Sequence, residues 1–207
     1  MASTIIHLAI AKKVQEKIRI ENKKDYYLGS IAPDISKQIG ESREVSHFLI
    51  NTKEDIPNLN IFVKRYPLFP YNSFEVGYFT HLYTDKVWNE SFLPNFIKDN
   101  SLKLVDGTEV KVTKEEAKNM LYSDYTNLNV KIIDEYQLDL SLFYEEFIPP
   151  KTNMKEIPVN QLDILLNKIG IILENSKSEK TYTLDFNSVK DFINTTAEQI
   201  IEEIKKY

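Results

Sequence analysis

The segment from Asn72 to Phe92, NSFEVGYFTHLYTDKVWNESF, constrains the fold more than any other part of the chain. Large aromatic side chains recur along it at steps of three and four residues, which is the spacing of one face of an α-helix. His81 and Asp85 share that face, one turn apart. We therefore expect a long helix, ending before Pro94, whose aromatic face is buried and carries two ionisable groups.

Helical patterns also dominate the rest of the chain. Pro33 is expected to end a short second helix near residues 25–33 and to leave Asp34 in a polar loop, because the residue before a proline avoids the α region. Asp106-Gly107 lies between two short β-branched runs, which favours a small β-hairpin near residues 102–112 with a two-residue turn. The expected fold is all-α, a mainly helical bundle in a single domain over residues 1–207. Further helices are expected near residues 4–18, 54–66, 113–135, 158–174 and 187–206.

The composition limits the interior and the partners of this domain. With 207 residues, 42% of them hydrophobic, the chain is long enough to bury a sizeable core. Its formal charge is −5 and no segment concentrates Lys and Arg, so we expect no nucleic-acid partner. No segment approaches the roughly 18 apolar residues that span a bilayer, and the N-terminus lacks the pattern of a signal peptide. We therefore expect a cytoplasmic protein without a stable membrane anchor.

The chain contains no cysteine, which excludes thiolate metal sites and cysteine nucleophiles. Any metal must then be held by imidazole and oxygen ligands, which suits zinc and other divalent ions such as manganese or iron. His7 lies one turn into the first expected helix, His47 follows a polar loop, and His81 precedes Asp85 by one turn. An imidazole and a carboxylate placed in this way on a rigid helix can bind one ion together.

Each of these residues also has a purely structural interpretation. A single helical histidine is more often a hydrogen-bonded residue than a metal ligand, and His81 with Asp85 fits an i,i+4 pair worth roughly 0.2–0.5 kcal/mol. Asp34 fits a turn former, since aspartate readily bonds its own following backbone. The combination favours a metal site, because a buried face that carries Asp85 needs a compensating positive charge.

Four short motifs, taken in order, resemble the zinc-dependent phospholipase C family, and more closely its small bacterial cytosolic relatives. The resemblance covers roughly the first 90 residues and is specific as a set rather than in any one part. The matching motifs are Thr4-Ile5-Ile6-His7-Leu8, Tyr27-Leu28-Gly29-Ser30-Ile31-Ala32-Pro33-Asp34, Ser46-His47-Phe48 and Gly77-Tyr78-Phe79-Thr80-His81-Leu82-Tyr83-Thr84-Asp85.

The resemblance implies an all-α bundle that holds a multi-zinc cluster and hydrolyses a phosphoester. It implies that Asp34, His47, His81 and Asp85 bind one ion. It places His7 on a second ion, with Asp85 near both. Asp34 and Asp85 are the candidate catalytic residues, and a spare carboxylate is expected to take the proton of the attacking water.

The chain also departs from that family. Family members use an N-terminal tryptophan as a ligand, whereas this chain begins Met-Ala-Ser, and it has no histidine after His81. At least one zinc of the family's cluster is therefore missing or rebuilt from carboxylates and amides. Asp124 and Asn127 are the candidates for additional ligands, and an exposed helix face explains them equally well.

Three functions stay open at this point. The first is a metal-dependent, zinc-using phosphoesterase of phospholipase C type that acts on a small phosphoester. The second is an HD-type nucleotide phosphohydrolase, although the adjacent His-Asp pair of that class is absent from the sequence. The third is a non-catalytic helical binding or scaffold protein with a structural metal, which the shortage of downstream ligands favours.

Overall fold

The computed structural model describes residues 1–51 and 53–207 and confirms a mainly helical fold with a small antiparallel β element. None of the described helices combines the length and the apolar character that crossing a membrane requires. The helices are α1 (Thr4–Gln15), α2 (Lys23–Gly29), α3 (Ile35–Gln38), α4 (Arg43–Ser46), α5 (Leu59–Arg65), α6 (Ser73–Val87), α7 (Lys114–Tyr136), α8 (Asp163–Asn175) and α9 (Phe186–Ile204). The strands are β1 (Ile97–Lys98), β2 (Ser101–Lys103) and β3 (Glu109–Lys111).

The long helix expected around His81 is α6. Asn72 caps it by accepting hydrogen bonds from the backbone N–H groups of Phe74 at 3.0 Å and Glu75 at 3.2 Å. Beyond α6 the chain continues through a π-helical turn over Trp88–Phe92 and a 3-10 turn over Leu93–Asn95. The face that the sequence predicts to be buried is buried, and its members are Phe74, Tyr78, His81, Asp85 and Trp88.

Two glycines allow α2 and α6 to pack backbone against backbone. A Cβ added at Gly77 would lie 2.0 Å from the carbonyl oxygen of Tyr26, and one at Gly29 would lie 2.1 Å from the carbonyl oxygen of Phe74. Only glycine fits at either position, because no other residue lacks a Cβ. The contact therefore fixes α6, and with it His81, relative to the residues that follow α2.

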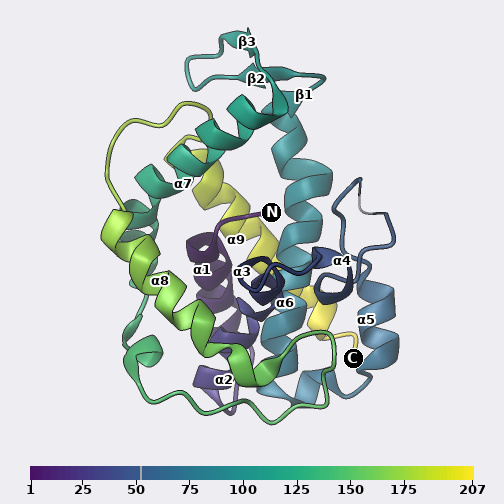
Figure 1. The fold of residues 1–207 in the computed structure, drawn as a ribbon. Helices are drawn as coiled ribbons and strands as arrows, with labels where there is room; N and C mark the ends of the chain where they lie inside the picture. The colour runs from purple at the N-terminus through teal and green to yellow at the C-terminus, as the bar shows by residue number, and fades with distance from the viewer. Residues whose placement is uncertain (52) are drawn as a thin grey trace.

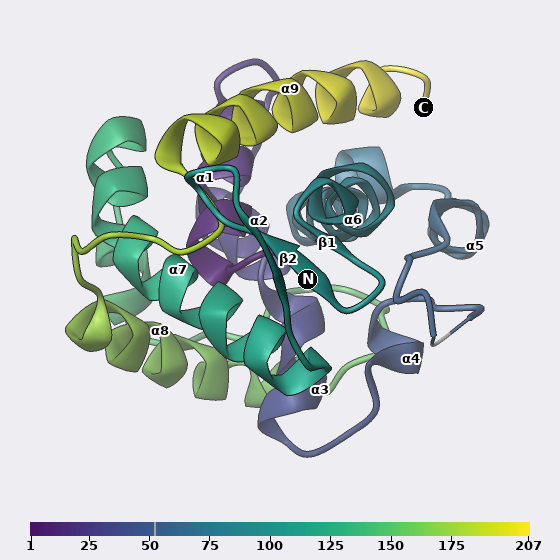
Figure 2. The same cartoon turned by 90° about the horizontal axis from the view of Figure 1, so that it is seen from above.

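The other helices surround α1, which lies near the centre of the molecule (Figure 1). Helices α7 and α9 pack directly against α1, and α6 packs against α1, α2 and α9. Seen from above, α9 runs across one side of α1 and α6, while α7 and α8 lie on the side away from α5 (Figure 2). Every residue from Ile5 to Ala11 is buried, so α1 has almost no polar face, and His7 lies in the interior.

The predicted β-hairpin is present, but its details differ from expectation. A third strand, β1, extends it, and the two-residue turn joins β1 to β2 at Asp99-Asn100. Both turn residues have positive φ, as a type I′ turn requires. The two-residue turn expected at Asp106-Gly107 is wrong, because a three-residue loop over residues 105–107 joins β2 to β3 with Gly107 at a φ of +86°. This arrangement is the common three-residue hairpin, in which glycine takes the left-handed position.

The surroundings of Asp34 also differ from expectation. Helix α2 ends at Gly29, and Ala32–Asp34 forms a 3-10 turn that leads directly into α3. Proline is tolerated in the first turn of a helix because its missing N–H needs no partner there. Pro33 therefore begins a helical turn instead of ending one. Asp34 consequently lies on well-defined helical backbone, not in the polar loop that the sequence suggested.

Candidate metal centre

Five residues from separate segments converge beside α6. His7 comes from α1, Asp34 from the turn before α3, His47 from the residue that follows α4, and His81 and Asp85 from α6. Their ligand atoms form two overlapping groups. These are His7–His81–Asp85 and Asp34–His47–His81, and within each group the atoms lie within 4.8 Å of one another. The fold thus brings together all five residues that the sequence suggested as metal ligands.

Hydrogen bonding fixes the ring of His81. Its Nδ1 lies 2.9 Å from the carbonyl oxygen of Ser30, which can only accept, so Nδ1 carries the proton. Nε2 therefore presents a lone pair to the other residues of the centre. Burial and the neighbouring ring of His7 lower the pKa of His81 to about 3, so the ring is neutral at pH 7. Neutral imidazole is the form that binds metals.

A chain of hydroxyl groups fixes the ring of His47 in a similar way. Its Nδ1 lies 2.8 Å from Oγ of Ser46. The hydroxyl of Ser46 donates to Oγ of Ser36 at 3.1 Å, and that of Ser36 donates to the carbonyl oxygen of Pro33 at 3.3 Å. Because the chain ends on an acceptor, Nδ1 of His47 is the donor and Nε2 keeps its lone pair. Histidine ligands commonly donate their second N–H in this manner.

The spacing of the free atoms is close to that of ligand atoms around a zinc ion. Nε2 of His47 lies 3.3 Å from Nε2 of His81, and each nitrogen lies 3.7 Å from Oδ2 of Asp85. Oδ1 of Asp34 lies 3.6 Å from Nε2 of His47. Zinc–ligand bonds of about 2.0–2.2 Å at tetrahedral angles place the ligand atoms roughly 3.3–3.6 Å apart. Two lone pairs that face each other at 3.3 Å repel unless a cation lies between them, so the residues present fit zinc.

Asp85 divides its two oxygens between the two groups. Oδ2 faces His47 and His81, whereas Oδ1 lies 3.4 Å from Nε2 of His7 and accepts the backbone N–H of Ala2 at 3.0 Å. Within the described residues, neither ring nitrogen of His7 has a hydrogen-bond partner, and an ion beside it would satisfy one of them. Burial acts to raise the pKa of Asp85, but the contact with His7 and the surrounding positive charge outweigh it and hold that pKa well below its usual range.

Arg43 is a charged neighbour of the centre that the sequence did not single out. Its Nη2 donates to Oδ2 of Asp85 at 2.8 Å, and its Nη1 pairs with Asp55. The side chain of Asn89 donates to the backbone oxygen of Asp55 at 2.7 Å and so supports the pair. Arg43 precedes His47 by one helical turn, so both side chains reach the centre from the same direction. That spacing is the sequence signal from which Arg43 could have been identified.

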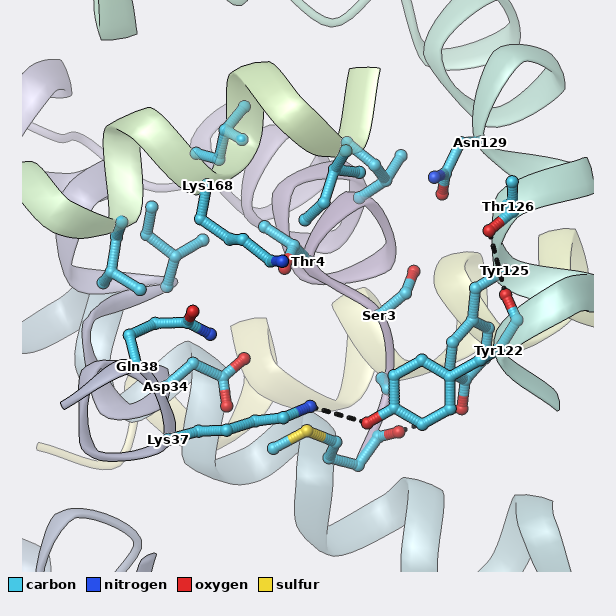
Figure 3. Close-up of a pocket in the computed structure, with 17 residues that line it drawn as sticks. Ser3, Thr4, Asp34, Lys37, Gln38, Tyr122, Tyr125, Thr126, Asn129 and Lys168 are labelled. Atoms are coloured by element: carbon cyan, nitrogen blue, oxygen red, sulfur yellow. Dashed lines mark hydrogen bonds between the residues drawn. The ribbon is translucent and has the colours of Figure 1, made fainter. Parts of the chain in front are cut away.

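Asp34 connects the centre to a cavity of about 320 Å³ between α1, α3, α7 and α8. It is the one member of the centre that lines this cavity, and Figure 3 shows its carboxylate with Lys37 on one side and Lys168 on the other. Burial acts to raise the pKa of Asp34, but contacts with His47 and His81 outweigh it and hold that pKa well below its usual range. The carboxylate that faces the cavity is therefore ionised.

Asp124 and Asn127, the expected additional ligands, do not join the centre. The carboxylate of Asp124 accepts the three backbone N–H groups of residues 182–184 at 2.6–2.8 Å. The side chain of Asn127 donates to the carbonyl oxygen of Lys180 at 3.0 Å. Both side chains are buried, not on an exposed helix face, and anchor the 180–184 segment to α7. Asp124 belongs to neither group of ligand atoms.

The family model for zinc-dependent phospholipase C matches residues 4–140, which is more than half of the chain and includes all five converging residues. No match was found among curated proteins or among solved structures. The helical architecture and the buried set of histidines and aspartates agree with this match. The chain therefore belongs to the zinc-dependent phospholipase C family.

Proposed function

We propose that this protein is a metal-dependent hydrolase of phosphoesters and that zinc is its metal. The observation that carries the proposal is the close approach of two histidines and two aspartates, His47, His81, Asp34 and Asp85, of which Asp34 also lines a cavity. The family match supports the same class of reaction. The expected substrate is a small phosphoester, because the net charge of −5 disfavours nucleic acid as a partner.

Each residue of the centre is assigned its own role in such a reaction. A divalent ion held there supplies Lewis acidity towards a phosphoryl oxygen. Oδ1 of Asp34 faces His47 and would hold the ion, and we assign its other oxygen, Oδ2, the acceptance of the proton from the attacking water. Both oxygens of Asp85 are engaged by neighbours, and we assign it the role of joining the two ligand groups. Arg43 is a positioning residue, because it acts on the reaction through Asp85.

Two alternatives predict different behaviour. An HD-type phosphohydrolase would prefer nucleotides, and both the missing His-Asp pair and the family match disfavour it. A binding or scaffold protein would hold its metal without turning over any phosphoester. The ionised carboxylate of Asp34 at the cavity wall favours the catalytic alternative, since a structural zinc site has no need of an open side.

Turnover of 4-nitrophenyl phosphate and bis(4-nitrophenyl) phosphate by the purified protein, with zinc or manganese added, tests the proposal. The native protein is expected to hydrolyse at least one of them. His81→Ala is expected to abolish the activity, and Asp34→Asn is expected to lower kcat about 10²- to 10⁴-fold, the range for loss of a general base. Asp106→Asn, at an exposed position of the β2–β3 loop, is the matched control and is expected to retain full activity.

Each alternative has its own outcome in this experiment. Stoichiometric zinc without turnover of any phosphoester would favour the scaffold protein. A strong preference for nucleotides over simple esters would favour the HD-type enzyme. If no divalent ion copurifies or binds at micromolar concentration, both catalytic proposals are wrong.

A further inference from the structure

Two lysines give the cavity beside Asp34 a positive wall. Lys37 comes from α3 and Lys168 from α8, and both side chains extend into the cavity (Figure 3). Within the described part of the chain, neither forms a salt bridge with a carboxylate, and Asp34 is the only acidic side chain on the wall. Two ammonium groups against one carboxylate give this partly enclosed space a net positive charge, which favours an anionic ligand.

A buried amide on the opposite wall lacks a hydrogen-bond donor. Asn129 of α7 is 4% exposed, lines the cavity, and donates from Nδ2 to Oγ of Ser176 at 3.1 Å. Ser176 itself donates to the carbonyl oxygen of Ile172 at 2.8 Å, so its Oγ accepts from Asn129, and this fixes the orientation of the amide. In the described structure Oδ1 of Asn129 is left without a partner. A hydroxyl group of a ligand would supply the missing donor.

The aromatic rings of the cavity already contact a lysine and neighbouring rings, which disfavours a cationic ligand. The ammonium group of Lys37 lies over the ring of Tyr122, 4.9 Å from its centroid, and donates to its hydroxyl at 2.7 Å. Tyr125 packs against Trp88 and Tyr122 and donates its own hydroxyl to the backbone of Met1. A quaternary ammonium group requires open aromatic faces or carboxylates. Tyr122 is 42% exposed, but the ammonium group of Lys37 beside it would repel a cation, and Asp34, the one carboxylate among the described lining residues, belongs to the metal centre.

We infer that the cavity binds the alcohol portion of the substrate, and that this portion is an anionic polyol. Lys37 and Lys168 bind its negative charge, and Asn129 accepts a hydrogen bond from one of its hydroxyl groups. Leu165 and Ile169 of α8 cover its carbon skeleton, since both line the same space. The volume of about 320 Å³ lies in the range of small-molecule sites. This inference rests on the proposed function, because it takes the phosphoester to be cleaved next to Asp34.

Binding of phosphonate analogues, which cannot be hydrolysed, tests the inference independently of turnover. The analogues share one phosphonate group and differ at the end of a short arm, which carries a carboxylate, a hydroxyl or a trimethylammonium group. Calorimetry with the purified protein and added zinc is expected to show the tightest binding for the carboxylate. The hydroxyl arm is expected to bind about three- to tenfold more weakly, and the trimethylammonium arm more weakly still.

Variants identify the groups responsible. Lys37→Met and Lys168→Met are each expected to reduce the preference for the carboxylate arm about three- to tenfold. Lys64→Met, on the exposed face of α5 and outside the cavity, is the control and is expected to leave the preference unchanged. A hydroxyl added to the carboxylate arm is expected to strengthen binding to the native protein and not to Asn129→Val.

The outcomes separate this inference from the proposed function. Equal affinity for the three arms, a preference for trimethylammonium, or no binding at millimolar concentration overturns the inference even when the protein hydrolyses phosphoesters. Preferred binding of the carboxylate arm, lost in the two lysine variants, supports the inference. If that binding occurs without turnover of any phosphoester, the cavity has the chemistry inferred here and the proposed hydrolysis is wrong.

Discussion

The imidazole rings of His7 and His81 lie face to face, with their centroids 3.9 Å apart and their planes at 5° to each other. Two protonated rings would repel each other strongly at this distance in a buried site, so the stack requires that at least one ring is neutral. The lowered pKa of His81 agrees with this requirement. Because His81 belongs to both ligand groups, the stack holds the two groups together.

Substitution of single ligands is expected to show which residues bind which metal ion. We expect the native protein to hold about two zinc ions per chain, one bound through His47 and His81 and the other through His7, with Asp85 offering one oxygen to each. His7→Ala and His47→Ala are each expected to leave about one ion, because the other group keeps its own ligands. Asp85→Ala is expected to leave none, because this carboxylate serves both groups. Elemental analysis after dialysis measures the content, and an equal loss in all three variants would contradict the division into two groups.

Arg43 and the metal are expected to compensate for each other. Arg43→Gln leaves the buried carboxylate of Asp85 without its guanidinium partner, which is expected to destabilise the metal-free protein by about 3 kcal/mol. Zinc neutralises the same carboxylate, so the loss is expected to be smaller in the zinc-loaded protein. Thermal unfolding with EDTA and with zinc measures both values. Arg19→Gln, at an exposed position, is the control, and equal losses for Arg43→Gln in the two conditions would show that Arg43 and the metal are independent.

The contact between α2 and α6 predicts opposite effects for two glycine substitutions. Gly77→Ala forces a methyl group against the carbonyl oxygen of Tyr26, so it is expected to cost about 3 kcal/mol or more and to lower the zinc content. Gly170→Ala lies within α8, where no atom of the described residues comes within 4 Å of the added methyl group. It is expected to stabilise the protein by about 0.5–1 kcal/mol through helix propensity. Chemical denaturation measures both, and similar effects at the two positions would contradict the packing described.

Glu156 is expected to make the stability depend on pH in the acid range. Burial acts to raise its pKa, but hydrogen bonds from Tyr66, Arg65 and the backbone of Lys155 outweigh it and lower that pKa below the ordinary value of 4.5. The folded state therefore prefers the ionised form. The resulting stability is present above about pH 4.5 and is lost as the pH falls through the lowered pKa.

Urea denaturation at pH 7 and at pH 3 tests this prediction. Glu156→Gln is expected to be less stable than the native protein at pH 7, and the difference is expected to shrink at pH 3. Glu198→Gln, at an exposed position of α9 without an ion pair in the described structure, is expected to behave like the native protein at both values. A constant difference between Glu156→Gln and the native protein would mean that the charge of Glu156 is not responsible.

The sequence correctly predicted those elements whose hydrophobic spacing matches the residues that are buried in the structure. The aromatic stripe of α6 is present where the spacing placed it, and the helix expected near residues 113–135 is α7, which opens with a capping box at Thr113 and Glu116. The outcome for Pro33 and for the turn at Gly107 was different, because proline and glycine each permit more than one backbone solution. The packing of the following segment decides which backbone conformation forms, and this packing cannot be predicted from the spacing of residues in the sequence.

In the candidate site, too, residues of one helix could be placed from the sequence, whereas contacts between distant segments could not. His81 and Asp85 could be placed together because one helix carries both, and their meeting with His7 depends on how α1 packs. Arg43 was missed because a single arginine in a polar stretch usually faces solvent, and its partners lie far along the chain. Asp124 was misjudged for the same reason, since the backbone donors that occupy it come from residues 182–184.

The glycine contact between α2 and α6 bears on any attempt to transplant the ligands into another protein. Gly29 immediately precedes Ser30, whose carbonyl oxygen accepts a hydrogen bond from His81. The orientation of the imidazole ring is therefore set by the end of α2 and not by α6, the helix that carries it. A graft of α6 alone would carry the histidine without the hydrogen bond that orients its ring. The smallest portable unit comprises α2, the turn at Asp34 and α6, and a designer who copies it must copy both glycines as well.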